Sequence, residues 1–261
     1  MKLEAPAETY DIPFVNEERL NWRHWLIAIV LIVTALWATP RIWKHLERFH
    51  TNADYRIPYS LSRDYWLYEW RLEKLEDINA VFLMGDSVIW GEYVLPNGTL
   101  SHFLNAQSHG AERFVNAGVN GLFPLALGGL IDDYAEPIRN RRVLVNCNLL
   151  WMSSPKADLQ IQKEERFNHS RLVPQFFPNI PCYKANANER LSVIIERNIQ
   201  FMSWVTHLQS TYYNDKSIPQ WTLADDGNDP PNYTNSYKNP LSQITMEVPL
   251  APEQDPLRGP E

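Results

Sequence analysis

The chain has 261 residues, of which 44% are hydrophobic, and a net charge of -7. This length can bury one sizeable core, so we expect one folded domain with an appendage. Lys and Arg are scattered and form no basic stripe, so composition excludes nucleic acid as an expected partner. Cys147 and Cys182 lack CxxC spacing, which argues against a zinc ribbon and leaves one disulfide or two buried thiols open.

An uncharged apolar segment lies near the amino terminus. Residues 25–39 contain no charged side chain and are followed by basic residues. From Trp25 to Trp43 the segment is just long enough for a bilayer core of about 30 Å, and its tryptophans fit interfacial anchors. We predict an N-terminal tail at 1–23 and a transmembrane signal anchor at 24–43, with the lipid bilayer as its partner. The alternative is a buried helix of a soluble core.

A second helical pattern follows the anchor. Tyr65, Tyr68, Leu72 and Leu75 recur at helical spacing with charged residues between them, which predicts an amphipathic helix. We interpret residues 44–78 as a helical connector that leads into the folded domain.

Alternating strand and helix patterns then occupy residues 79–151. Short apolar runs in NAVFLMG, RFVNAG and RRVLVNCNLLW predict three strands, and helical patterns at 100–107 and 122–138 lie between them. This alternation favours an α/β fold with a doubly wound parallel sheet, in a domain spanning 79–214.

The pattern loosens after Trp151. Residues 153–167 suggest a short helix, and a capping box at Asn186–Glu189 begins a longer helix that runs to about Leu208. We interpret its apolar stripe as core packing; the stripe consists of Leu191, Ile194, Ile195, Ile199, Met202 and Val205. Residues 215–261 are rich in proline and are expected to be extended or disordered.

A Gly-Asp-Ser triplet at residues 85–87 follows the first predicted strand. Open parallel sheets bind ligands beyond the carboxyl ends of their strands. A serine in such a turn can present its hydroxyl to a cleft, with backbone N–H groups nearby for a developing oxyanion. The surrounding sequence is not G-x-S-x-G, so the nucleophile elbow of α/β-hydrolases is not matched. Ser87 is therefore the candidate nucleophile.

At these residues the chain resembles the SGNH/GDSL hydrolases. Gly85, Asp86 and Ser87 match the first motif of that family, and Asn116, Gly118 and Gly121 match its second motif, N-x-G-x-x-G. The resemblance covers roughly residues 79–151. It implies a flavodoxin-like sheet of the SGNH type and an oxyanion hole that includes the backbone N–H of Gly121.

The third and fourth motifs of the family do not match. In place of G-x-N-D the third strand ends in VLVNCNLLW, where Asn148 is our first choice and Asn146 our second for the oxyanion-hole amide. Both could instead be polar residues that satisfy local backbone groups. The D-x-x-H motif is absent, because neither His169 nor His207 has an Asp three residues earlier. We expect both histidines to lie away from Ser87, with the domain incomplete or the base lost.

The leading hypothesis is a serine esterase or O-acyltransferase in which Ser87 attacks an acyl carbonyl. The resemblance implies acyl, especially acetyl, esters of cell-envelope carbohydrate or small esters as substrates, with no cofactor and no metal. The alternative is a catalytically deficient SGNH-fold membrane protein that serves in glycan binding or assembly.

Orientation depends on two opposing indications. More basic residues follow the apolar segment than precede it, which by the positive-inside rule would place the domain in the cytoplasm. Long domains translocate despite flanking charge, and the resemblance favours the cell envelope. We therefore expect a single-pass membrane protein with an extracytoplasmic domain.

Overall fold

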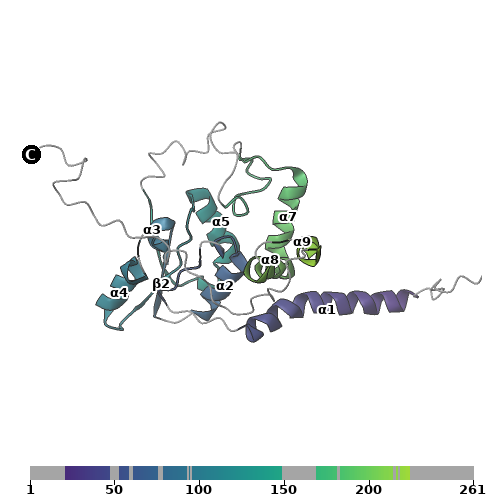
Figure 1. Ribbon diagram of the computed structural model, residues 1–261, viewed down its shortest axis with the longest axis horizontal. Coiled ribbons are helices and arrows are strands. Elements are labelled where there is room, and N and C mark those ends of the chain that lie inside the picture. Colours follow the sequence, from purple (N-terminus) through teal and green to yellow (C-terminus); the bar gives the residue numbers. More distant parts are fainter. Residues whose placement is uncertain are drawn as a thin grey trace, which may run out of the picture.

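The computed structural model describes residues 21–47, 53–58, 61–75, 79–92, 94, 96–148, 169–180, 183–213, 216 and 218–223. Helices surround a parallel sheet of three strands, and one long helix extends away from this body (Figure 1). The predicted α/β class with a parallel sheet is confirmed. The helix expected at 153–167 and Cys182 lie outside the described residues.

The elements follow one another in this order. The helices are α1 (Trp22–Leu46), α2 (Tyr65–Lys74), α3 (Ser87–Trp90), α4 (Leu100–Ser108), α5 (Pro124–Tyr134), α7 (Ala187–Asn198), α8 (Gln200–Tyr212) and α9 (Ile218–Leu223). The strands are β1 (Ala80–Met84), β2 (Arg113–Asn116) and β3 (Arg142–Val145), and short 3-10 helices lie at Pro96–Gly98 and Glu136–Ile138.

The sheet has the strand order β2-β1-β3, and both pairings are parallel. β1 is central and all five of its residues are buried, which explains its uninterrupted apolar sequence. Because β2 and β3 lie on opposite sides of β1, the chain reverses its direction of winding there. The crevice beyond the carboxyl ends of β1 and β3 is where open α/β sheets bind ligands.

The helix predicted at 62–77 exists as α2, but it belongs to the core. Trp66, Leu67, Tyr68, Trp70 and Leu72 are each at most 2% exposed. Apolar side chains surround this helix, so it packs against α5 and α8 together. The interpretation of residues 44–78 as a connector is therefore wrong for α2.

The helix predicted from the capping box is broken into two. The capping box at Asn186 is present, but Ile199 adopts an extended conformation and separates α7 from α8. The core-packing interpretation of the stripe is wrong in part, because Leu191, Ile195, Ile199 and Met202 are between 37% and 52% exposed.

Two arginines explain why the apolar stripe of α7 faces outward. Arg197 donates to the carbonyl oxygens of Arg171 and Val173, and Arg190 donates to those of Gln175 and Tyr183. These bonds satisfy carbonyl groups of an irregular segment, which are costly to leave unpaired when buried. The arginine face of α7 therefore turns inward, and the opposite face is left in contact with solvent.

The long helix α1 is not a core helix. The large apolar side chains between Leu26 and Val33 are each more than half exposed. Pro40 is the only buried residue of α1. The alternative of a buried helix in a soluble core is therefore wrong. By length and composition α1 can cross a membrane, although a signal sequence near an amino terminus meets the same description.

A short helix lies within the carboxyl-terminal segment that was expected to be extended. Ile218–Leu223 forms α9, so this part of the 215–261 segment differs from the prediction. Its proline, Pro219, is in the first turn, where a missing backbone N–H costs nothing because the first N–H groups of a helix have no partner.

A buried charged cluster joins α1 to the rest of the domain. His207 on α8 is fully buried; its Nδ1 lies 2.6 Å from Asp64 Oδ2 and its Nε2 lies 3.0 Å from Glu47 Oε2. Trp43 and Tyr212 also donate hydrogen bonds to Glu47. Glu47 is the C-cap of α1 and Asp64 is the N-cap of α2, so one histidine connects three helices.

Replacing His207 is expected to destabilise the domain strongly. In His207→Ala two buried carboxylates lose their cationic partner, and removing one member of a buried pair typically costs about 3 kcal/mol or more. Thermal unfolding of the full chain in detergent should show a lower midpoint for His207→Ala. The control His45→Ala changes an exposed histidine near the carboxyl end of α1 and should leave the midpoint unchanged. Equal midpoints for both variants would contradict the role of the cluster.

The same cluster predicts a loss of stability at alkaline pH. Burial by itself lowers the pKa of His207, but the charge of Asp64 and hydrogen bonds to Asp64 and Glu47 outweigh it and raise this pKa to about 9. Because the pKa of His207 is raised in the folded state, the cluster stabilises the fold fully below the ordinary histidine pKa of 6.5, and this contribution is lost as the pH approaches 9. The unfolding midpoint should therefore fall across this range in the wild type, and the fall should be smaller in His207→Ala.

Candidate functional site

Ser87 lies where the sequence predicted it, directly beyond the carboxyl end of β1. Asp86 caps α3 by accepting a hydrogen bond from the N–H of Val88, and Ser87 is the first helical residue. Ser87 is partly exposed. Within the described part of the chain, neither its hydroxyl nor its backbone N–H has a hydrogen-bond partner, so both groups are available to a ligand.

Two asparagines from the end of β3 meet Asp86. Asn148 Nδ2 lies 2.6 Å from Asp86 Oδ2, and Asn146 Nδ2 lies 3.4 Å from Asp86 Oδ1. Asn146 also lies close to Gly85, where an added Cβ would be 2.9 Å from the Asn146 Cβ. The structure thus brings residues 85–87 together with both asparagines, and their side chains bind a carboxylate.

The loop that follows β2 packs against α3. The Asn116 side chain donates to the carbonyl oxygen of Ile89 and accepts from the N–H of Gly118. A Cβ at Gly118 would lie 2.5 Å from the backbone nitrogen of Trp90, so only glycine permits this approach. The second motif therefore forms a surface that is complementary to the helix carrying Ser87.

On the side of this loop that faces the core, buried side chains bind its carbonyl oxygens. Arg71 donates to Asn116 O at 2.6 Å and Tyr68 donates to Ala117 O at 3.1 Å, both from α2. His169 Nε2 lies 2.7 Å from Asn120 O. Three carbonyl groups between residues 116 and 120 are thereby directed away from solvent and toward the core.

The contacts of His169 define its protonation. Its Nδ1 lies 2.9 Å from the hydroxyl of Tyr65, and burial lowers its pKa, which favours the neutral ring. Because a carbonyl oxygen accepts only, Nε2 carries the proton that is donated to Asn120, and Nδ1 accepts from Tyr65. Both ring nitrogens are therefore used in holding the loop.

The orientation of the Asn120 carbonyl fixes that of the next N–H group. In a trans peptide the C=O and the following N–H point in opposite directions, so the N–H of Gly121 points away from His169. Gly121 has φ of 80°, a conformation that favours glycine. No acceptor for this N–H exists among the residues that the structure describes.

No described histidine forms a hydrogen bond to Ser87. His169 is bound to Asn120 and Tyr65, and His207 is bound to Asp64 and Glu47. His207 is a packed residue that is fully buried. In the described ranges, neither of these two histidines is therefore bonded to Ser87 as a base.

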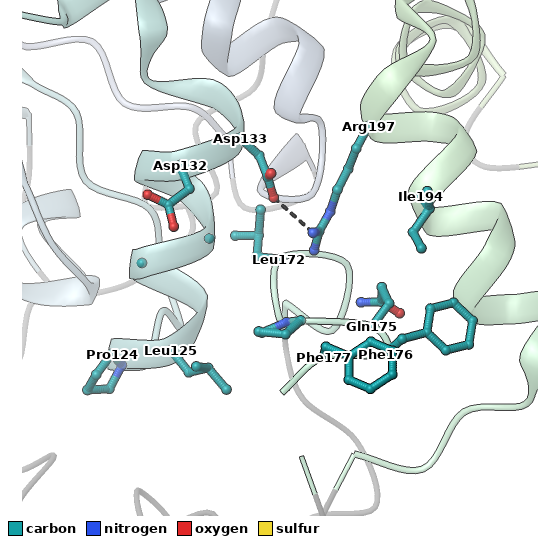
Figure 2. A pocket seen from close by; sticks show the side chains of 13 residues that line it. Pro124, Leu125, Asp132, Asp133, Leu172, Gln175, Phe176, Phe177, Ile194 and Arg197 are labelled. Carbon is teal, nitrogen blue, oxygen red and sulfur yellow. Dashed lines mark ion pairs between the residues drawn. The ribbon is translucent and has the colours of Figure 1, made fainter. Parts of the chain in front are cut away.

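A separate cavity of about 670 Å³ lies between α5 and α7. Leu125, Leu172 and Phe176 contribute apolar surface, and Asp133 and Arg197 form an ion pair across it at 3.0 Å (Figure 2). None of the residues predicted for the site lines this cavity. Its lining contains no serine, cysteine or histidine.

Comparison with known proteins gives no relative. Neither a protein-family model, nor a curated protein, nor a solved structure matches the chain. The site is therefore defined by the contacts of this chain alone. Sequence reasoning placed Tyr65 and Tyr68 on an amphipathic helix but assigned neither of them, nor Arg71, to the site; the signal for that role was a face with a charged residue and hydroxyl groups on a helix rich in tryptophan.

Two glycine substitutions test whether the loop must approach α3. Gly118→Ala should displace the loop and lower the unfolding midpoint, because its Cβ would overlap backbone atoms of Trp90 and Ile89. Gly128→Ala, in the middle of α5 with nothing within 4 Å of the new Cβ, should stabilise by about 0.5–1 kcal/mol. A neutral Gly118→Ala would show that the loop does not pack as described.

Proposed function

We propose that this chain is a membrane-anchored serine esterase or O-acyltransferase of the SGNH/GDSL type. The observation that carries the proposal is the partly exposed Ser87 beyond the carboxyl end of β1, together with the N–H groups of Ser87 and Gly121, which have no acceptor among the described residues. Unpaired donors beside a nucleophile are what stabilise the oxyanion of an acyl-transfer intermediate.

In the proposed reaction Ser87 Oγ attacks the carbonyl carbon of an ester and gives its proton to solvent, and the carbonyl oxygen accepts hydrogen bonds from the two N–H groups. The C–O bond to the alcohol then breaks, and the alcohol leaves after taking up a proton. Water or an acceptor hydroxyl next attacks the acyl carbon, the bond to Ser87 Oγ breaks, and Ser87 Oγ takes up a proton again. Asn148, our first choice from sequence, has a short bond to Asp86. Asn146 has the weaker bond at 3.4 Å, so we assign Asn146 as the side-chain donor and Asn148 as support for Asp86.

His169 has a positioning role in this proposal. It fixes the Asn120 carbonyl and thereby aims the Gly121 N–H. A removed oxyanion-hole donor typically costs a factor of about 100 to 1,000 in kcat, so the orientation of this single peptide is important for the rate.

Membrane anchoring by α1 is supported by two cation–π contacts. Arg23 lies over Trp22 and Arg41 lies over Trp37, with the cation 5.7 and 4.2 Å from the ring centroids. Arg23 and Arg41 are 18 residues apart, which is roughly 27 Å along a helix and suits a bilayer core of about 30 Å. Such pairs are typical of membrane interfaces. We therefore propose a single-pass protein whose domain acts on acetyl esters of cell-envelope carbohydrate.

One observation favours the alternative of a binding protein. The hydroxyl of a serine is a poor nucleophile without a base, and both His169 and His207 are engaged elsewhere. In that case residues 85–87 would form a recognition site for glycan hydroxyl or acetyl groups, without turnover.

A covalent probe separates these two functions. The full chain in detergent is incubated with a fluorophosphonate. We expect slow labelling of Ser87 together with weak hydrolysis of p-nitrophenyl acetate, because in the described residues the proposed oxyanion donors have no acceptor and no histidine is bonded to Ser87. Ser87→Ala should abolish both signals, and Ser192→Ala, at an exposed serine on α7, should retain them. Absence of labelling in the wild type would favour the binding protein.

A further inference from the structure

Helix α7 presents an exposed face without charge. Leu191, Ile195 and Ile199 follow one another at intervals of four residues, so they form one stripe along the helix. Their exposed fractions are 52%, 37% and 45%. The exposed residues of this face are Asn188, Leu191, Ser192, Ile195, Asn198 and Ile199. A stripe of this kind on a surface helix indicates a partner.

The position of α1 restricts what this partner is. Trp37 is 60% exposed, whereas Ala38 and Thr39 are already partly buried and Pro40 is buried. No spacer therefore separates the apolar part of α1 from the part that packs on the domain. If α1 spans a bilayer up to the level of Trp37 and Arg41, the domain must lie directly on the membrane surface.

The stripe lies on the side of the domain that faces the free part of α1. α8 packs against α1, and α7 packs against α8. In Figure 1, α7, α8 and α9 lie at the end of the domain from which α1 extends, while α5 lies on the other side of α7. Ile194 and Arg197 face the cavity on the α5 side (Figure 2). At about 100° per residue, Ile195 in the middle of the stripe lies about 160° around α7 from Arg197, so the stripe is turned away from α5 and toward the side on which the free part of α1 extends.

We propose that α7 is a second membrane-binding element, whose Leu191, Ile195 and Ile199 enter the boundary between the headgroups and acyl chains of the bilayer. This inference rests on the proposed anchoring by α1. An amphipathic helix lying in the interface buries its apolar face in this way. Because the outward face of α7 carries no charge, the contact requires no anionic lipid.

Fluorescence quenching by lipids tests the proposal in the full chain. With Cys147 and Cys182 replaced by serine, a nitrobenzoxadiazole probe is attached to Ile195→Cys, and the protein is reconstituted into phosphatidylcholine vesicles that contain a nitroxide at the carbonyl end of the acyl chain. We expect the probe at 195 to lose fluorescence. The control is Phe103→Cys, 56% exposed on α4 at the far end of the domain (Figure 1), which should lose none.

A third probe separates failure of this inference from failure of the anchor. Ile29→Cys lies within α1 and should be quenched if α1 is in the bilayer. Quenching at 29 with a signal at 195 equal to that at 103 would overturn the proposed contact of α7 alone. No quenching at 29 would overturn both proposals. A disulfide between two copies of Ile195→Cys without lipid quenching would show that the stripe joins two protein chains, and would also overturn it.

Discussion

The protonated ring of His207, held between two buried carboxylates, is the interaction on which the arrangement of the domain depends. On one side it binds Glu47, at the end of the long apolar helix. On the other it binds Asp64, which caps the first turn of α2. A desolvated charge pair is stabilising only when its geometry and hydrogen bonds are complete, so this contact determines how α1, α2 and α8 meet.

The position of α2 then determines the shape of the candidate site. Tyr65 acts through His169, and together with Tyr68 and Arg71 it directs three carbonyl oxygens between residues 116 and 120 inward. Buried carbonyl groups need donors, and these three are satisfied from the core side. The N–H of Gly121 points the other way and has no acceptor among the described residues, so pairing the carbonyl groups leaves this donor free for a ligand.

Much of this was predictable from sequence because the responsible signals are local. The strand before Gly85, the glycines at 118 and 121 and the capping box at Asn186 each follow from residue type and spacing. Three features required tertiary structure. The first is the cluster of Glu47, Asp64 and His207, which are far apart in sequence. The second is the inward direction of the arginines on α7, which leaves an apolar stripe exposed, and the third is the pairing of Asn148 with Asp86. Periodicity shows that a helix has two faces, but not which face the core will bind.

The direct junction at Ala38 has a mechanical consequence. A domain on a flexible linker samples a volume whose radius grows with linker length, whereas here the polypeptide has no such freedom. With α1 in a bilayer, α3 and Ser87 would be held at one height, at the end of the domain opposite to the direction in which α1 extends (Figure 1). Ser87 would then meet its ligands only by lateral diffusion of the protein in the membrane. Only polymers that pass through the layer at that height would come within reach of Ser87.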